Sequence, residues 1–213
     1  MQGALYTTTY NAGFQDSGVI PDGNPTGWSD TRTLGGMSPV INDVNVVINV
    51  SGGFNGDLRA YLSYNGILLP LLNRVGTGSG GTILSTFGFS TAGFSNVKLD
   101  DAASGGSIHD VATPGSSPTY SYTPDGGSLA SFNGSNPNGN WTLFFADMAS
   151  GGGSGPPTLT SWSLEITAVP EPVNVALGIF GGVFLVVTLV RSRRVRNLIG
   201  RWRAAFVVWV NAV

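Results

Sequence analysis

NGNWTLFFADMASGGGSGPPTLTSWSLEI, residues 138–166, holds two segments in which apolar and polar side chains alternate, separated by a glycine- and proline-rich turn. The alternating apolar residues of 141–145 are Trp141, Leu143 and Phe145. In 159–167, one face is expected to carry Thr160, Trp162, Leu164 and Ile166. A period of two residues is typical of a β-strand with one buried face. The stretch therefore predicts two β-strands.

Two segments upstream show the same period. In 41–50 the apolar side chains at positions 44, 46, 48 and 50 share a face, and in 58–64 the shared face holds Leu58, Ala60, Leu62 and Tyr64. Turn-forming sequences separate the segments: SGGFNGD, GTGSGG, PDGG and NGSNPNGN. No convincing helical period precedes residue 173. Short strands joined by such turns predict an all-β fold, a jelly-roll β-sandwich.

A different pattern begins near the end of the chain. Residues 173–190, VNVALGIFGGVFLVVTLV, carry no charge and reach the minimum length for a helix that crosses a bilayer. A basic run follows at once, with Arg191, Arg193, Arg194 and Arg196. Arginines beside an apolar span mark its cytoplasmic side. We therefore expect one C-terminal transmembrane helix, with the β-domain outside the cytoplasm.

Charge and composition exclude several classes of function. Residues 1–172 contain four basic and twelve acidic side chains, a net charge of −8, whereas 173–213 contain six arginines and no acid. An acidic body does not suit nucleic acid, which requires a cationic face. The chain has no cysteine and a single histidine, which excludes disulfides, thiolate catalysis and multi-histidine metal sites.

These features divide the chain into four parts. Residues 1–16 form an N-terminal segment, 17–168 the β-sandwich domain, 169–196 a sorting signal and 197–213 a short extension. The first residues have neither a basic region nor an apolar run, so they are not a signal peptide. Export then depends either on a segment upstream of residue 1, which we favour, or on the C-terminal span alone. The extension is either an interfacial amphipathic helix or a continuation without a role.

Two segments together resemble the P domain (P/Homo B domain). They are SGGFNGDLRAYLSYNG (51–66) and 138–166, and the matching positions are Gly56, Asp57, Leu58, Gly139, Trp141, Leu143, Asp147, Trp162 and Leu164. The resemblance implies a β jelly roll of the kind that usually follows a subtilisin-like protease domain and stabilises it. The chain departs from the family pattern because Ser51-Gly52-Gly53 replaces a frequent histidine and no protease domain is present.

The end of the chain resembles a PEP-CTERM sorting signal. Its three parts occur in order: the motif Val169, Pro170, Glu171 and Pro172, then the apolar span, then the arginines. The resemblance implies cleavage near the motif by a membrane-embedded exosortase in a Gram-negative bacterium. The body would then pass from the inner membrane to the cell surface or the exopolysaccharide matrix. Residues 197–213 depart from the family, which usually ends soon after the arginines.

Two polar clusters are candidate sites. His109, between Ser107 and Asp110, is either part of a catalytic Ser–His–Asp arrangement or a loop histidine with a local hydrogen bond. Asp100 and Asp101, beside a glycine-rich loop, are either calcium ligands or turn residues that bond to their own backbone. Beyond calcium we expect no cofactor. Asp57 and Asp147 are expected to order the turns that contain them.

Aromatic side chains raise the question of carbohydrate binding. Trp141 and Trp162 share the apolar face of their strands and are expected in the core. Trp28 lies outside clear periodicity and is the aromatic residue expected to be freest of the core, and Tyr120 and Tyr122 are further candidates for a position that faces solvent. The first functional hypothesis is a non-catalytic, exported, membrane-tethered β-sandwich sorted by exosortase. The alternatives are an accessory domain of a separate subtilisin-like protease and a module or hydrolase that acts on exopolysaccharide.

Overall fold

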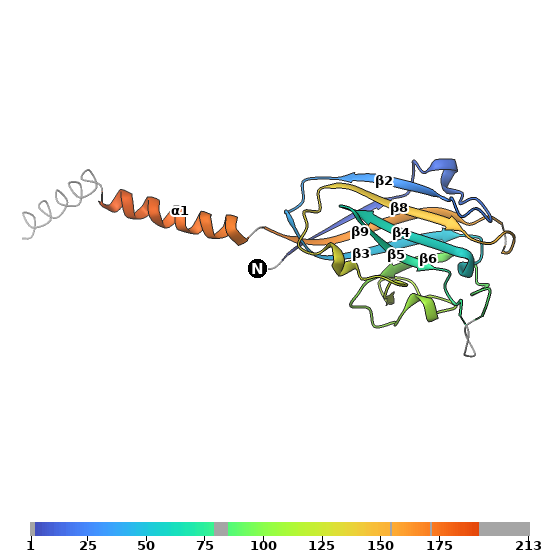
Figure 1. The fold of residues 1–213 in the computed structure, drawn as a ribbon. Helices are drawn as coiled ribbons and strands as arrows, with labels where there is room; N and C mark the ends of the chain where they lie inside the picture. Colours follow the sequence, from blue (N-terminus) through green and yellow to red (C-terminus); the bar gives the residue numbers. More distant parts are fainter. Residues whose placement is uncertain (1–2, 79–84, 154, 171, 192–213) are drawn as a thin grey trace, which may run out of the picture. The chain divides into compact units, whose positions relative to one another are not determined.

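The structure, a computed structural model, describes residues 3–78, 85–153, 155–170 and 172–191 (Figure 1). The chain divides into two compact units, Met1–Val169 and Pro170–Val213. The regular elements described in the first unit are strands and short 3-10 turns, and the second unit contains a helix. The prediction of an all-β body is therefore confirmed, and its finer assignment as a jelly roll stays a prediction.

Two sheets make up the first unit. The first has the strand order β1 (Ala4–Tyr10), β9 (Thr158–Val169), β3 (Val40–Ser51), β6 (Phe94–Leu99) and β7 (Ser121–Tyr122). The second has the order β2 (Trp28–Leu34), β8 (Gly139–Asp147), β4 (Leu58–Tyr64) and β5 (Ile67–Asn73). Neighbouring strands are antiparallel except β6 and β7. Short 3-10 turns connect them: η1 (Gln15–Gly18), η2 (Asn55–Asp57), η3 (Ile108–Asp110) and η4 (Leu129–Phe132).

The four segments with a period of two are all strands: β3, β4, β8 and β9. On β4 the burial alternates without exception from Leu58 to Tyr64. One face assignment was wrong, because Thr160 is exposed and Leu159 is buried. The register between β3 and β9 shifts at this point, pairing Asn49 with Ser161 and Val50 with Leu159. A bulge of this kind moves the side chains on one side of it to the opposite face.

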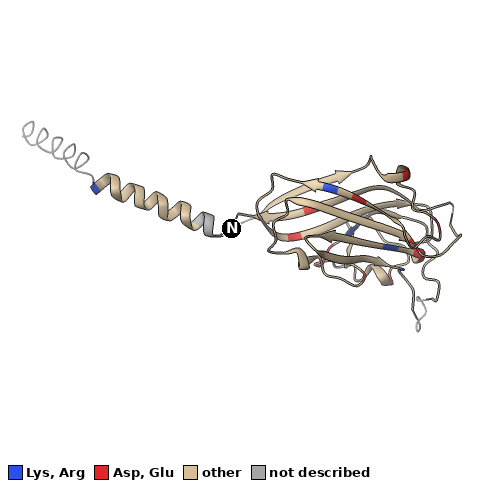
Figure 2. Cartoon of the chain, turned by 45° about the horizontal axis from the view of Figure 1, so that its top comes forward, with Lys and Arg blue, Asp and Glu red and all other residues tan. Residues whose placement is uncertain are grey.

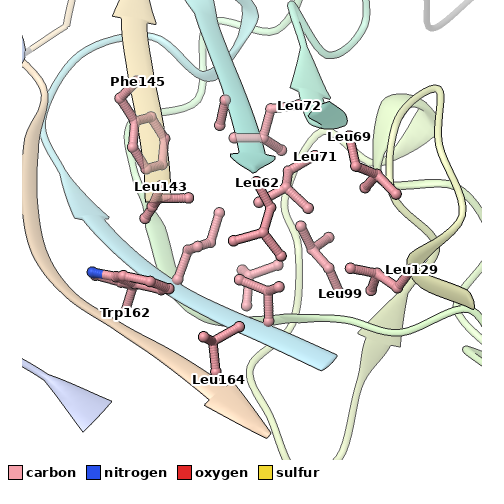
Figure 3. Close-up of a cluster of buried hydrophobic side chains, with 14 of the residues drawn as sticks. Leu62, Leu69, Leu71, Leu72, Leu99, Leu129, Leu143, Phe145, Trp162 and Leu164 are labelled. Atoms are coloured by element: carbon pink, nitrogen blue, oxygen red, sulfur yellow. The ribbon is translucent and has the colours of Figure 1, made fainter. Parts of the chain in front are cut away.

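The core lies between the two sheets. Figure 3 shows leucines from β4, β5 and β8 gathered in one buried cluster with Trp162 and Leu164 of β9. Trp162 and Trp141 are both fully buried. The Trp141 ring stacks on Tyr64 with centroids 3.9 Å apart, and its indole N–H donates to the Pro137 carbonyl at 2.9 Å. Buried aromatic rings of this size contribute strongly to the stability of the sandwich.

The N-terminal residues belong to the sandwich. Strand β1 pairs with β9 along its whole length, from Ala4 opposite Ala168 to Tyr10 opposite Trp162. The predicted boundary between 1–16 and the domain is therefore corrected: the compact unit includes these residues. Thr7 and Thr9 of β1 are exposed while Tyr6 and Tyr10 are half-buried, as expected of an edge strand with one face on the protein.

The second unit contains helix α1 (Pro172–Arg191). Its side chains are described from Ala176 onward, and the large apolar ones are exposed, including Phe180, Val183 and Phe184. Figure 2 shows that this part of α1 carries no acidic or basic residue before Arg191. Within the described part of the chain, no helix meets the length and hydropathy needed to cross a membrane. The transmembrane assignment of 173–190 stays a prediction.

Candidate functional site

The single histidine is held at both ring nitrogens. His109 Nδ1 lies 2.7 Å from Asp125 Oδ2, and Nε2 lies 2.8 Å from the carbonyl oxygen of Thr77. Both partners are acceptors, so a protonated imidazole, which donates from both nitrogens, satisfies both. Ser107 Oγ instead accepts the backbone N–H of His109 at 3.2 Å and caps η3. Because no hydrogen bond joins the Ser107 hydroxyl to the ring, this arrangement differs from a Ser–His–Asp triad.

The surroundings of His109 favour its charged form. Burial of the ring acts to lower the pKa of His109. The hydrogen bonds to Asp125 and to the Thr77 carbonyl, together with the negative charges of Asp125 and Asp110, raise it. The net result is a pKa above the ordinary value. The protonated ring therefore ties η3 to the segments that contain Thr77 and Asp125.

His109 makes the stability of the domain depend on pH. Because the folded-state pKa lies above the unfolded value of about 6.5, the stabilisation is fully present below that pH and is lost as the pH rises through the folded pKa. We expect His109→Gln to lower the free energy of unfolding most under mildly acidic conditions and progressively less toward alkaline pH. Denaturant titrations of the full chain in detergent, followed by tryptophan fluorescence at several pH values, measure this. A loss of unfolding free energy that is equal at every pH would contradict an ion pair between protonated His109 and Asp125.

The two aspartates proposed for calcium are used in local structure. Asp101 accepts the backbone N–H groups of Leu129 and Ala130 and the Ser128 hydroxyl, at 2.6–3.0 Å, so that it fixes the start of η4. Asp100 Oδ1 accepts the N–H of Ala102, and its Oδ2 lies 3.5 Å from Lys98 Nζ. Among the residues that the structure describes, no group of three or more His, Cys, Asp or Glu side chains is placed to hold a metal ion. Calcium binding at this pair stays a prediction.

Of the three aromatic residues considered for a solvent-facing position, Trp28 and Tyr122 are buried. Trp28 is only 4% exposed, and its indole N–H donates to the Val19 carbonyl at 2.8 Å. Tyr122 is buried and its hydroxyl accepts the N–H of Gly115. Tyr120 is exposed, as expected. The partners of both side chains, Val19 and Gly115, lie in neighbouring loops, and no periodic pattern within the segments of Trp28 and Tyr122 indicates this burial.

The Gly56-Asp57-Leu58 motif lies where η2 enters β4, in close contact with another loop. A Cβ on Gly56 would stand 2.5 Å from the backbone nitrogen of Phe89, and the Gly56 N–H donates to the Phe89 carbonyl at 2.9 Å. Phe89 in turn donates its N–H to the Val75 carbonyl at 3.1 Å. The glycine is therefore required because two backbones meet at this point.

A network of hydrogen bonds, made by backbone groups and the Asp125 carboxylate, extends from there to the histidine. The Gly76 N–H donates to the His109 carbonyl at 2.8 Å, and the Asn73 N–H donates to Asp125 Oδ2 at 3.0 Å. The Met148 N–H donates to the Asp57 carbonyl at 2.8 Å. We name the segments so joined the loop cluster; it consists of residues 54–57, 73–78, 85–90, 107–110, 123–126 and 147–152. The sequence motifs at Gly56–Asp57 and Asp147 thus meet in space.

A pocket of about 270 Å³ opens within the loop cluster. Its walls come from three segments and include the aromatic residues Phe54, Phe87 and Phe89, with Asp57 and the backbone of 149–152. Phe87 is 80% exposed, the highest exposure among the large apolar side chains described in the first unit. Sequence reasoning did not identify this pocket, because residues 54, 87 and 152 come together only through the fold.

Carboxylates outnumber cations beside the pocket. Burial raises the pKa of Asp57, Arg74 lowers it, and the charge of Asp22 raises it. Burial also raises the pKa of Asp147, whose Oδ1 accepts the Ala149 N–H at 3.1 Å, and Asp57 and Asp22 add to the effect. Arg74 Nη2 lies 3.8 Å from Asp57 Oδ1. The Arg74 guanidinium is therefore paired with Asp57, and the charges of Asp57 and Asp22 both act on Asp147.

A second buried carboxylate network lies between the sheets. The Trp162 indole N–H donates to Asp30 Oδ2 at 2.7 Å, and Arg32 Nε lies 2.7 Å from the same oxygen. The Arg32 guanidinium also lies over the Tyr10 ring, 4.9 Å from its centroid. Asp30 occupies an inward-facing position of β2, where an apolar residue is the rule, and for this reason the alternation of β2 was missed.

The remaining predicted site residues lie in structural positions or outside the described part. Trp141, Leu143 and Leu164 are in the core, and Gly139 is the first residue of β8. Val169 ends β9 and Pro172 begins α1, which ends at Arg191. Glu171, Arg193, Arg194 and Arg196 lie outside the described residues. Glu165, the other glutamate, is paired with Lys98 at 3.0 Å.

Comparison with known proteins gives distant likenesses only. No family model matches the chain, and no curated protein matches it significantly. A serine protease of Aeromonas sobria in complex with its chaperone is 20% identical, with a TM-score of 0.46. A second structure of the Aeromonas sobria serine protease is 18% identical, with a TM-score of 0.45. Each match covers 78% of this chain and 27% of the solved one, so this chain spans about a quarter of their length.

Proposed function

We propose that this protein is a non-catalytic β-sandwich displayed outside the cytoplasm, tethered by its C-terminal helix and sorted by an exosortase to the surface or exopolysaccharide matrix. The observation that carries the proposal is the surface of α1. Its described side chains from Ala176 to Val190 are all exposed, and among them only Thr188 is polar. A helix that is apolar on every side is stable only when another apolar phase covers it. Lipid around the whole run 173–190 supplies that phase.

The connection between domain and helix supports the tether. Strand β9 ends at Val169, and α1 begins at Pro172, so the proline-containing spacer is very short. Pro170 and Pro172 cannot donate to a sheet ladder and stiffen the chain at this point. A cleavage enzyme in the membrane would therefore find the motif next to the bilayer surface. Cleavage there would release the complete sandwich, with its net charge of about −8 or −7 depending on whether Glu171 stays with it.

The absence of catalysis is the second part of the proposal. His109 is fixed between Asp125 and the Thr77 carbonyl, so its ring nitrogens are occupied. Glu165 is in an ion pair with Lys98. Asp57 is buried in the wall of an apolar pocket, and Asp147 is buried and accepts the Ala149 N–H of another wall. These positions suit structural and binding roles.

The test is the mass of the product. The full chain is expressed behind a secretion signal, with an internal tag in the body, in hosts with and without exosortase. We expect a product that ends near residues 170–172 only when exosortase is present, and an intact membrane-bound chain otherwise. Glu171→Ala should block the cut, whereas Glu165→Gln should not. An uncut chain in both hosts would overturn the sorting proposal.

A further inference from the structure

We propose that the pocket of the loop cluster binds an organic cation of the alkylammonium class. The inference goes beyond the proposed function because it assigns a ligand chemistry to the displayed domain. Its basis is a cavity of about 270 Å³ with phenylalanines and a carboxylate in its walls. This volume lies just below the range of about 300–1,000 Å³ that is typical of drug-sized ligands, so the pocket fits a group the size of a side chain.

The aromatic walls are the first element of the argument. Phe54, Phe87 and Phe89 line the cavity, and a ring face attracts a cation through its quadrupole. Glycines hold two of these rings in place. A Cβ on Gly152 would stand 2.3 Å from the Phe54 ring, and a Cβ on Gly76 would stand 2.6 Å from the Phe89 ring. Phe87 is 80% exposed and packs little, which leaves its ring accessible to a ligand.

Charge is the second element. Asp57 lines the pocket itself, and Asp22 and Asp147 both bind the backbone of the loop that forms one wall. Asp22 accepts the Gly151 N–H at 3.0–3.1 Å, and Asp147 accepts the Ala149 N–H. Arg74 is the cation that faces Asp57, and it also donates to the Gly56 carbonyl at 3.2 Å. Three carboxylates against one guanidinium leave a net negative field at an apolar pocket, which is the complement of an alkylammonium group.

A neutral ligand fits these observations less well. An uncharged apolar group would take water away from the carboxylate of Asp57 and leave it with the Arg74 guanidinium, 3.8 Å away, as its charged partner, and this desolvation costs free energy. A sugar ring needs several directed donors and acceptors, whereas the polar side chains of the pocket walls are those of Asp57, Ser90 and Ser150. A cation satisfies the aromatic faces and the carboxylate at the same time.

The experiment uses the full chain in detergent at neutral pH and n-butylammonium as the probe. Two neutral probes are compared with it: n-butanol, of the same shape, and glucose. Binding is followed by the chemical shifts of the backbone amides. We expect butylammonium to shift the amides of residues 87–90 and 149–152 saturably, and the neutral probes to leave them unchanged. Equal binding of n-butanol, preferential binding of glucose, or no binding of butylammonium would each overturn the proposal.

Variants locate the binding in the pocket. Because Phe87 is exposed, Phe87→Ala should leave the fold intact and weaken binding about 2–5-fold, the size of an exposed cation–π contact. Phe87→Leu should weaken it as much, since the ring and not the apolar surface is needed. Tyr120→Ala removes an exposed aromatic elsewhere and should have no effect. Asp57→Asn should weaken binding about tenfold, as expected for the loss of a charged partner. Unchanged affinity in both Phe87→Ala and Asp57→Asn would refute the site.

A lysine-containing tripeptide, Gly-Lys-Gly, identifies the source of the cation. Tighter binding of the peptide than of butylammonium indicates a protein side chain as the natural ligand, and equal binding indicates a free amine. Both results support an alkylammonium site. The test is independent of the tether, because a chain that exosortase does not cut still carries the pocket.

Discussion

Replacing Trp162 by alanine is expected to lower the free energy of unfolding of the β-sandwich by about 3–5 kcal/mol, the range measured for buried aromatic residues truncated to alanine. The side chain is fully buried, and its ring lies 4.9 Å from that of Tyr10. Removal leaves a large cavity and takes away one hydrogen-bond donor from Asp30. Because small domains are stable by about 5–15 kcal/mol, the change removes a large part of the total.

Trp162→Phe is the matched variant. It keeps most of the apolar volume but removes the N–H that donates to Asp30, so the loss should be smaller. Equilibrium unfolding of the full chain in detergent, followed by circular dichroism, gives both values. If alanine and phenylalanine cost the same, the hydrogen bond would dominate and packing would be minor. A loss under about 1 kcal/mol for alanine would contradict the burial of this residue in the core.

Introducing a charge in the middle of α1 is expected to release the protein from membranes. Val183 lies near the centre of the run 173–190 and is exposed on the helix. An arginine at the centre of a spanning helix costs about 2.5–3.5 kcal/mol on insertion scales. Val183→Arg should therefore shift much of the chain from the carbonate-washed membrane pellet to the soluble fraction, which immunoblotting of both fractions measures.

Val183→Leu is the control for this change. It keeps the position apolar, so the chain should remain in the pellet like the wild type. The fold of the sandwich should be the same in both variants, since they differ only in α1, and circular dichroism checks this. A wild-type chain that carbonate extracts from membranes would argue against the helix as a tether, whatever the variants do.

The strands that have one apolar face could be predicted from the sequence. The strands in which a side chain breaks the alternation of apolar and polar residues could not. β4 alternates along its whole length and β8 alternates over residues 141–145, so the burial of these residues could be predicted one by one. β2 was missed because Asp30 occupies an inward position and is stabilised there by Trp162 and Arg32. β5 is almost continuously apolar, and Pro70 in its middle argues against a strand. Such strands depend on partners that lie far away in the sequence.

The candidate site was predictable only in fragments. Asp57 and Asp147 were singled out through their motifs. Nothing local indicates that Asp57 shares a pocket with Phe87, or that Asp147 binds the backbone of the loop that forms another wall. The glycine-rich stretch near residue 151 was interpreted as a sheet connection, and it also forms a pocket wall. His109 illustrates the same limit. Its partners, Thr77 and Asp125, are 32 and 16 residues away, so the ring's environment follows from the topology.

The central claim is that the body is exported and tethered by α1. The most direct test of this claim is to measure on which side of the membrane each end of the helix lies. Because the chain has no cysteine, single substitutions can be labelled without background. Ser104→Cys, at an exposed position of the body, and Ser192→Cys, beside the arginines, are each expressed behind a secretion signal in spheroplasts and treated with an impermeant maleimide. We predict labelling of Ser104→Cys in intact spheroplasts and of Ser192→Cys only after lysis. Labelling of both in intact spheroplasts, or of neither, would contradict a chain that crosses the membrane with its body outside.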